Sequence, residues 1–264
     1  MNEVLFYDLK AGSKPAPSLS SRVTAEVGRD IVTGRYAPGT LLKDEETLSR
    51  RYRVSRTVIR DAIKVLVGKG LLEVRRGIGT RVKPRHSWGL LDNDVLAWQL
   101  SGPIDSSIQL QLMEIRQVFE PRAARWAASR GTAEDLKNLE TACEQMEASV
   151  DAIEEFVMAD AAFHRAILRA SHNEFLSALE GVIYTTLLSS IRTTNPERSA
   201  NVLSVPLHQE VCEAVRAGDG TLAETRMKLL LDDACKRLLF GISRLSPDDE
   251  PAPEAQDDTH QPEA

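Results

Sequence analysis

The sequence has no long hydrophobic run and few aromatic residues. Aromatic side chains make up 5% of the 264 residues, whereas hydrophobic residues make up 42%, a balance typical of helix-rich globular cores. No apolar stretch approaches the roughly 18 residues that a membrane-spanning helix needs, and the N-terminus lacks the basic-then-apolar pattern of a secretion signal. We therefore expect a soluble, cytoplasmic protein without a membrane partner.

Cysteine is scarce as well. Cys143, Cys212 and Cys235 lie far apart, in segments of helical periodicity. An odd number of widely spaced cysteines supports neither a disulfide framework nor a cysteine-based zinc site. We expect buried free thiols.

The net charge of −6 is distributed unevenly. Residues 1–90 hold 18 Lys and Arg against 9 Asp and Glu, a net charge of +9, and the remaining residues hold 15 against 30, a net charge of −15. A basic segment of this kind indicates nucleic-acid binding that weakens steeply with salt. A basic face that only contacts solvent is the alternative.

Residues 54–66 have the pattern of a DNA-recognition helix. Their apolar positions follow helical spacing, which leaves polar and basic side chains together at the exposed N-terminal end. Arginine there can reach guanine edges or phosphates in a major groove, and hydroxyl groups can bind phosphate oxygens. The predicted contacts from this end are Ser55, Arg56, Thr57 and Arg60.

The flanking segments complete a winged helix-turn-helix. A short helical pattern at 44–52 and a turn at 52–54 precede the recognition helix, while 71–75 alternates like a strand and 77–80 turns into 81–83. Helix, turn, helix and a basic two-stranded wing is a DNA-binding arrangement. Further predicted DNA contacts are Arg50, Arg75, Arg76 and Gly79.

Breaks in these patterns divide the chain into five segments. They are a flexible arm at 1–18, the winged helix-turn-helix at 19–86, a linker with a short helix at 87–105, an all-helical domain at 106–245 and a disordered acidic tail at 246–264. The first helix is expected behind a Ser20/Ser21 cap. Six or seven helices are expected in the second domain, so the predicted fold is mainly α.

One Asp and two His residues of the helical domain could hold a metal ion. Asp160 and His164 are four residues apart and project from the same helical face, and His208 begins a later helix. This donor set suits Zn²⁺, Ni²⁺ or Mn²⁺. An ordinary hydrogen bond on a helix surface is the alternative.

Arg116 lies on a stretch that faces the core. Burial of a guanidinium is costly unless an anion or a buried acid meets it. A carboxylate ligand would meet this requirement, and so would a salt bridge to Glu120, four residues later.

These motifs resemble the GntR superfamily of bacterial transcription regulators, and specifically its FadR-like subfamily, over roughly residues 20–240. The matching stretches are 37–42, 54–57 with Arg60, 66–72, 77–82, 88–92, 114–121, 160–164 and 214–219. Two positions depart from the pattern: Lys43 replaces the usual proline, and Glu46 stands where some members carry a DNA-contacting arginine.

The resemblance implies specific roles for the helical domain. One Asp and three His usually hold a metal in this domain type, and Leu230 stands at the fourth position, which leaves a three-ligand site. An arginine at the position of Arg116 helps to bind a carboxylate effector, and Asn173 and Arg192 are expected to line the same pocket.

Segments 88–98 and 116–128 look most like the galactonate and other sugar-acid repressors of the subfamily. This likeness implies an aldonate or hexuronate effector, a homodimer, and a pseudopalindromic double-stranded DNA operator that is released when the effector binds. A short acid such as lactate or pyruvate is the alternative effector. A metalloenzyme that uses Asp160, His164 and His208 lacks a nearby general base and a nucleophile motif, and a nucleoid-type DNA binder would not need the second domain.

Overall fold

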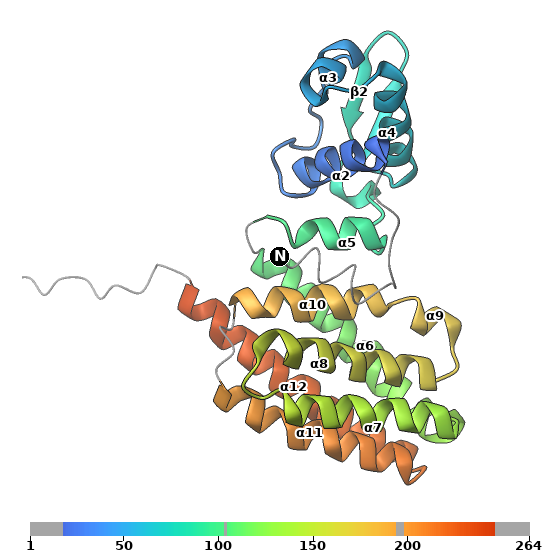
Figure 1. Ribbon diagram of the computed structural model, residues 1–264, viewed down its shortest axis with the longest axis vertical. Helices are drawn as coiled ribbons and strands as arrows, with labels where there is room; N and C mark the ends of the chain where they lie inside the picture. The colour runs from blue at the N-terminus through green and yellow to red at the C-terminus, as the bar shows by residue number, and fades with distance from the viewer. Residues whose placement is uncertain (1–17, 103–104, 194–197, 246–264) are drawn as a thin grey trace, which may run out of the picture.

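The computed structural model describes residues 18–102, 105–193 and 198–245, with side chains except at 191–200 and 245. A smaller N-terminal domain lies at one end, helix α5 lies in the middle, and a larger helical bundle lies at the other end (Figure 1). Apart from Ser18, the predicted arm lies outside the described residues, and so does the predicted acidic tail.

The described residues of the N-terminal domain form three helices and a two-stranded antiparallel sheet. Its elements are α2 (Leu19–Val32), α3 (Glu45–Tyr52), α4 (Arg56–Gly68), β1 (Leu72–Arg75) and β2 (Gly79–Val82). In the sheet, Leu72 pairs with Val82 and Arg75 pairs with Gly79. The sequence therefore predicted the winged helix-turn-helix correctly.

Side-chain caps set the helix starts of this domain. The Ser18 hydroxyl accepts a hydrogen bond from the Ser21 backbone N–H at 3.0 Å, so α2 begins earlier than the expected Ser20/Ser21 cap. Asp44 caps α3 and Ser55 caps α4 in the same way. Between the two helices, Arg53 adopts a φ of 53°, and this left-handed residue reverses the chain within the predicted turn.

Helix α5 (Asn93–Gln99) belongs to the cores of both domains. It follows a short 3-10 helix, η1 (Arg85–Ser87). Val95 and Trp98 pack in the core of the N-terminal domain, whereas Leu96 and Leu100 pack in the core of the bundle. The short helix predicted within segment 87–105 is therefore present as α5 and is packed on both sides.

Gly28 of α2 permits the close approach of α5. A Cβ atom at this position would lie 2.3 Å from Cζ3 of Trp98, and Trp98 is only 1% exposed. The ring has no free space to move into, so a side chain at position 28 would be overpacked.

Gly28→Ala is expected to lower the free energy of unfolding of the N-terminal domain by about 1–3 kcal/mol, as measured by urea denaturation. Helix propensity alone predicts that this change raises the free energy of unfolding by about 1 kcal/mol. A decrease would therefore be caused by the contact with Trp98. Gly68→Ala is the matched control, because nothing lies within 4 Å of its Cβ; it should be neutral or stabilising. An equal gain in both variants would contradict the close packing.

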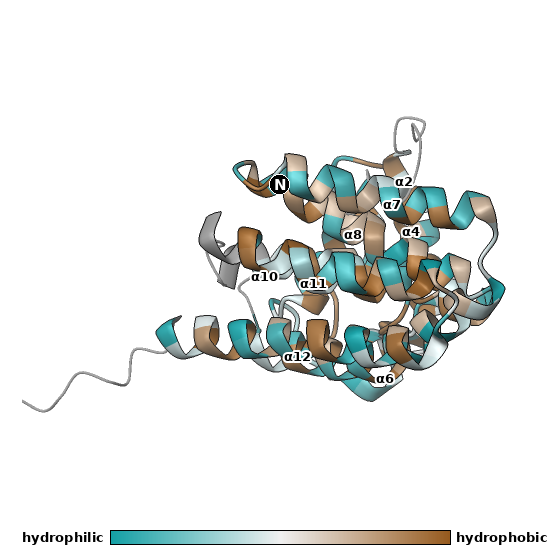
Figure 2. Cartoon of the chain, turned by 90° about the horizontal axis from the view of Figure 1, so that it is seen from below, coloured by the Kyte–Doolittle hydropathy of each residue, from teal (hydrophilic) through white to brown (hydrophobic). Residues whose placement is uncertain are grey.

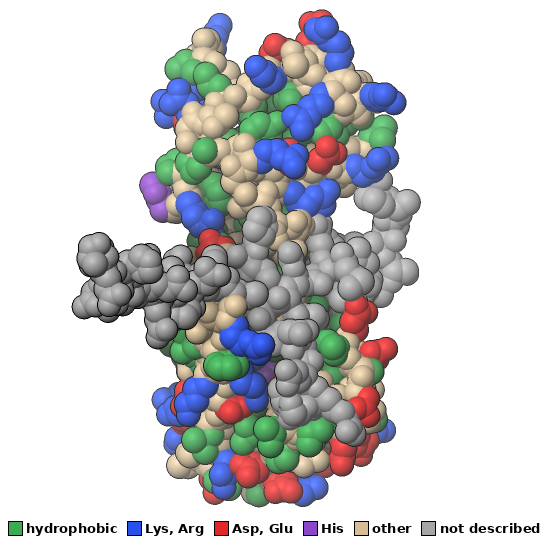
Figure 3. All heavy atoms as spheres, turned by 90° about the vertical axis from the view of Figure 1, so that its left-hand side faces the viewer, with side chains coloured by type: hydrophobic (Ala, Val, Ile, Leu, Met, Phe, Trp, Pro, Cys, Tyr) green, Lys and Arg blue, Asp and Glu red, His purple; other side chains and the backbone are tan. Residues whose placement is uncertain are grey.

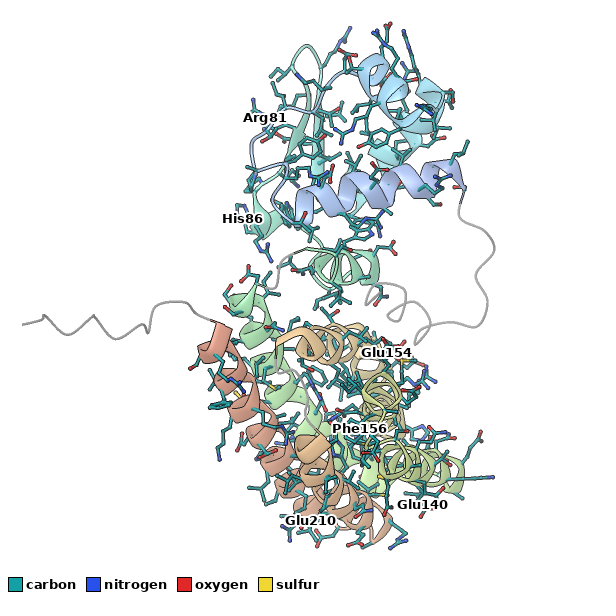
Figure 4. The ribbon with its side chains drawn as sticks, turned by 60° about the vertical axis from the view of Figure 1, so that its left-hand side comes forward. Arg81, His86, Glu140, Glu154, Phe156 and Glu210 are labelled. Atoms are coloured by element: carbon teal, nitrogen blue, oxygen red, sulfur yellow. The ribbon has the colours of Figure 1, made fainter. Side chains whose placement is uncertain are left out.

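The bundle contains seven described helices. They are α6 (Ser106–Arg130), α7 (Ala133–Ala148), α8 (Ile153–Ala170), α9 (Glu174–Ser177), α10 (Glu180–Thr193), α11 (Arg198–Arg216) and α12 (Gly220–Leu245). Apolar and polar residues alternate along α11 and α12 (Figure 2), and Phe156 lies inside the bundle while Glu140 and Glu210 lie toward its outside (Figure 4). No described helix is long and apolar enough to span a membrane.

The three cysteines are free thiols. Cys143 and Cys212 are buried in the bundle, as expected, whereas Cys235 is partly exposed. The prediction of burial was therefore wrong for Cys235 alone, which lies on α12 where one side of the helix faces solvent.

Candidate DNA-binding surface and metal centre

The recognition helix α4 presents its predicted contacts at its first turn. Arg56 is the first helical residue, and Thr57 and Arg60 follow on the exposed side. The Ser55 hydroxyl accepts a hydrogen bond from the backbone N–H of Val58 at 3.3 Å. The hydroxyl hydrogen of Ser55 is not used by this cap, so it can still be donated to a phosphate oxygen.

Acidic residues of α3 hold the arginines of this surface. Glu46 lies 2.6 Å from Nη2 of Arg56 and 3.1 Å from Nη2 of Arg50. Glu45 lies 2.7 Å from Nε of Arg60. Arg50, Arg56 and Arg60, all predicted to contact DNA, are therefore ion-paired within the protein.

The wing extends the basic surface. Arg75 ends β1 and pairs with Glu73 at 3.0 Å, and exposed Arg76 follows in the turn. Gly79 has a φ of 116°, a conformation that side-chain-bearing residues avoid. Lys and Arg side chains are frequent over the visible face of this domain (Figure 3), and Arg81 lies in the wing (Figure 4).

The three predicted metal ligands lie together inside the bundle. Nε2 of His164 and Nε2 of His208 lie 3.1 Å and 3.2 Å from the same oxygen, Oδ1 of Asp160. All three donor atoms are within 4.8 Å of one another. The ring of Phe163 packs edge-on against both imidazoles, with centroids at 5.2 Å and 4.8 Å, and so restricts their orientation.

Outer hydrogen bonds determine which imidazole nitrogens face Asp160. Nδ1 of His164 contacts the Glu120 carboxylate, and Nδ1 of His208 lies 2.8 Å from the carbonyl oxygen of Ser204. Both partners accept only, so each Nδ1 carries the hydrogen. In neutral rings the Nε2 lone pairs then converge on the Asp160 carboxylate, an arrangement that requires a cation or additional protons. Carboxylates and carbonyls that orient metal-binding histidines are typical of metal sites.

The buried charges of the cluster also favour a cation. Burial opposes the charged form of Glu120, but Arg116 and His164 outweigh this effect and lower the pKa of Glu120 to about 2. Burial likewise opposes the charged form of Asp160, but hydrogen bonds from the two histidines, in the protonated form that carries a hydrogen on Nε2, outweigh that effect and lower the pKa of Asp160. When the rings are neutral and Nε2 carries no hydrogen, a cation would have to replace these hydrogen bonds. Two carboxylates and one guanidinium leave a net charge of −1 when both histidines are neutral. The residues present therefore fit a divalent metal.

Arg116 joins this cluster through Glu120. Its Nε donates to Oε1 of Glu120 at 2.5 Å, and its side chain is 1% exposed. Its Nη1 is buried and has no hydrogen-bond partner among the described residues. An unsatisfied buried donor costs roughly 1–3 kcal/mol or more. The predicted salt bridge is thus present, yet one guanidinium nitrogen remains available to a carboxylate ligand.

The other predicted positions lie elsewhere. Asn173 caps α9, where its Oδ1 accepts hydrogen bonds from the backbone N–H groups of Phe175 and Leu176. Its side-chain oxygen is therefore used by the cap, and among the described residues it makes no hydrogen bond to Asp160, His164 or His208. The side chain of Arg192 lies outside the described residues. Leu230 is buried in the bundle core and offers no donor for a fourth ligand.

The sequence did not reveal the second contact of Glu120 or the role of the Ser204 carbonyl. The sequence predicted Glu120 only as a partner of Arg116, because the two residues are four positions apart on one helix. Its contact with His164 spans 44 residues, and no signal in a single sequence indicates such a pair.

A separate cavity lies where the two domains meet. Its volume is about 510 Å³, and its walls come from the end of α2, Arg85, the end of α5, the start of α6 and part of α10. None of the metal-cluster residues lines it. A site for a metal and a carboxylate requires donor atoms that converge on one point. Such atoms are found in the cluster of Asp160, His164 and His208, and not in the lining of this cavity.

Comparisons with known proteins match both domains. Residues 19–82 match the family of bacterial regulatory proteins called the gntR family, and residues 111–233 match the FCD domain. A structure of Lar, described as controlling expression of the Listeria monocytogenes agr system, covers 88% of this chain and 100% of that chain with a TM-score of 0.61 and 20% identity. This structural likeness shows the shared fold.

Two relatives from Escherichia coli (strain K12) extend the match. The galactonate operon transcriptional repressor is 34% identical over 220 residues, which cover 83% of this chain and 96% of that protein. The putative L-lactate dehydrogenase operon regulatory protein is 31% identical over 216 residues, which cover 79% and 82%. The chain therefore belongs to the gntR family of bacterial regulatory proteins, with an FCD domain as its helical half, and is a transcription regulator rather than an enzyme.

Proposed function

We propose that this regulator represses a sugar-acid catabolic operon and releases its operator when a small hydroxylated carboxylate binds in the bundle. The observation that carries the proposal is the joining of Arg116 to the Asp160 cluster through Glu120. Similarity to the galactonate operon repressor supports an aldonate or a related acid. A short acid such as lactate is the second candidate, supported by the lactate dehydrogenase operon relative.

Asp160, His164 and His208 would hold Zn²⁺, Ni²⁺ or Mn²⁺ in this proposal. Such an ion supplies a Lewis-acidic position that a ligand carboxylate can occupy. Arg116 contributes its unpaired Nη1 as a charge-assisted donor to the same anionic group. Leu230 contributes no donor, so a three-ligand site keeps positions open for the effector.

The proposed operator complex contains a homodimer. Two recognition helices related by a twofold axis would read the half-sites of a pseudopalindromic operator. The surface offers apolar side chains for self-association on α6 and α12, including Val118 and Phe240, which are 78% and 66% exposed. Light scattering would test this state, and a mass of one 29.2 kDa chain at micromolar concentration would contradict it.

The structure provides a connected route from the bundle to the recognition helix. Helix α8, which carries Asp160, packs against α10, and α10 packs against α5. A Cβ atom on Gly181 of α10 would lie 2.5 Å from Oδ1 of Asn93. At the other side of α5, Lys69 follows α4 directly and pairs with Asp92 at 2.7 Å and Asp94 at 2.9 Å. Effector binding that displaces α10 would therefore shift α4, provided that the effector favours one arrangement.

Thermal stability in the presence of candidate acids tests the effector class. The protein is mixed with aldonates, hexuronates, lactate or pyruvate, with and without divalent metal. A ligand at one hundred times its Kd should add about 2.7 kcal/mol of stability. Stabilisation by a sugar acid supports the proposal, stabilisation by short acids alone supports the second candidate, and no response to any acid contradicts both.

Arg116→Lys is expected to remove most of the stabilisation by the effector. Lysine keeps the charge beside Glu120 but lacks the planar donor edge that pairs with a carboxylate. DNA binding without effector should be unchanged, because Arg116 is buried in α6 of the bundle and is not part of the N-terminal domain. Arg122→Lys, on an exposed turn of the same helix, is the matched control. A normal effector response in Arg116→Lys would leave the salt bridge to Glu120 as the role of Arg116.

A further inference from the structure

Glu46 occupies an unusual place on the proposed DNA-binding surface. It lies in the first turn of α3, and its two carboxylate oxygens contact different arginines: Oε1 contacts Arg50 and Oε2 contacts Arg56. A carboxylate that faces DNA is repelled by phosphates, so it should weaken binding unless it has a specific task.

Stability does not explain this pair. The side chains of Glu46 and Arg56 are 55% and 59% exposed, and an exposed ion pair contributes only about 0–1 kcal/mol. The pair does, however, restrict the guanidinium of Arg56. One nitrogen, Nη2, is engaged by Glu46 at 2.6 Å, and no other described residue holds the remaining N–H groups, which can therefore contact a base.

We propose that Glu46 is a positioning residue that determines base specificity by orienting Arg56. The carboxylate holds one edge of the guanidinium, so that the other N–H groups face O6 and N7 of a guanine in a fixed geometry. The neighbouring pair of Glu45 with Arg60 has the same form but involves one arginine only. Glu46 also anchors Arg50, and the shared carboxylate sets the spacing between two basic side chains at the DNA surface.

This inference rests on the proposed binding to an operator, so the experiment begins with that binding. The full-length protein selects its preferred site from a random double-stranded DNA library. Kd values are then measured for that site and for each of its single-base variants at one salt concentration. If the wild type enriches no site, operator recognition itself fails, and the role of Glu46 fails with it.

Variants of Arg56 and Glu46 then test whether Glu46 orients Arg56 or only adds a negative charge to the DNA-binding surface. R56K keeps the charge and loses the planar donor edge, so the base pair at which it loses discrimination is the one read by Arg56. E46A should lose about fivefold or more discrimination at that same base pair, while its affinity for non-specific DNA stays equal or rises. E46Q, which keeps an acceptor oxygen, should retain part of the discrimination.

Two outcomes would overturn the proposal. The first is unchanged discrimination in E46A at every base pair, with a uniform gain in affinity, which would reduce Glu46 to a repulsive charge. The second is a further loss of discrimination when E46A is added to R56K, since Glu46 would then act without Arg56. D61A is the matched control, because it removes an exposed carboxylate of α4 that pairs with Lys64; it should leave discrimination unchanged.

Discussion

Arg56→Ala is expected to abolish specific operator binding while leaving the fold intact. Arg56 is exposed at the first turn of α4, where a guanidinium can make two hydrogen bonds to guanine. Each such contact contributes about 1–3 kcal/mol of discrimination, so two copies in a dimer contribute about 2–6 kcal/mol, or roughly 30-fold to 20,000-fold in Kd. Fluorescence anisotropy with a labelled promoter fragment measures the change.

Arg35→Ala is the matched control for this prediction. Arg35 is also an exposed arginine of the N-terminal domain, but it pairs with Asp30 at 3.0 Å and follows the end of α2, outside the helix-turn-helix and the wing. Its loss removes one positive charge without removing a groove contact, so only a modest, salt-dependent change is expected. Equal affinity losses in the two variants would mean that Arg56 acts through charge alone.

His208→Ala is expected to eliminate retained divalent metal. His208 would supply one of three donors, and the donor group found here among the described residues contains only Asp160, His164 and His208, so two donors remain when its Nε2 is removed. The loss of a direct ligand should exceed the roughly 10-fold to 100-fold decrease in affinity that follows removal of an outer partner. Glu120→Gln, which alters such an outer partner of His164, should fall within that smaller range. Elemental analysis and titration of the chelator-treated protein with Zn²⁺, Ni²⁺ or Mn²⁺ give both values.

His172→Ala is the matched control for His208→Ala, because it removes a histidine that is not part of the cluster. His172 is a surface residue, and its Nε2 lies 2.9 Å from Asp135 at 49% exposure. This variant should bind metal as the wild type does. If the wild type neither retains metal nor binds any of the three ions, protons rather than a metal lie between the Asp160 carboxylate and the Nε2 atoms of His164 and His208.

Local patterns predicted much of the molecule. The exposed N-terminal end of α4 follows from the spacing of apolar residues, and the pairing of Asp160 with His164 follows from one helical turn. Local patterns also predicted the wing, the helical character of the bundle and the short helix near α5. The observed start of α2 differs from the predicted one because Ser18, Ser20 and Ser21 can all cap a helix. Which serine does so depends on the backbone geometry, which the sequence does not specify.

Contacts between distant segments were decided by tertiary structure. His208 reaches Asp160 across 48 residues, and Glu120 reaches His164 across 44, because the packing of α6, α8 and α11 brings particular faces together. The sequence alone determined the types of side chain, their order along each helix and the basic character of the N-terminal domain. Only the tertiary structure decided that Arg116 joins the cluster of Asp160, His164 and His208 through Glu120, that Glu46 holds Arg56, and that α5 packs in two cores. Local spacing depends on a fixed helical repeat, whereas distances between helices depend on how all their side chains pack at once.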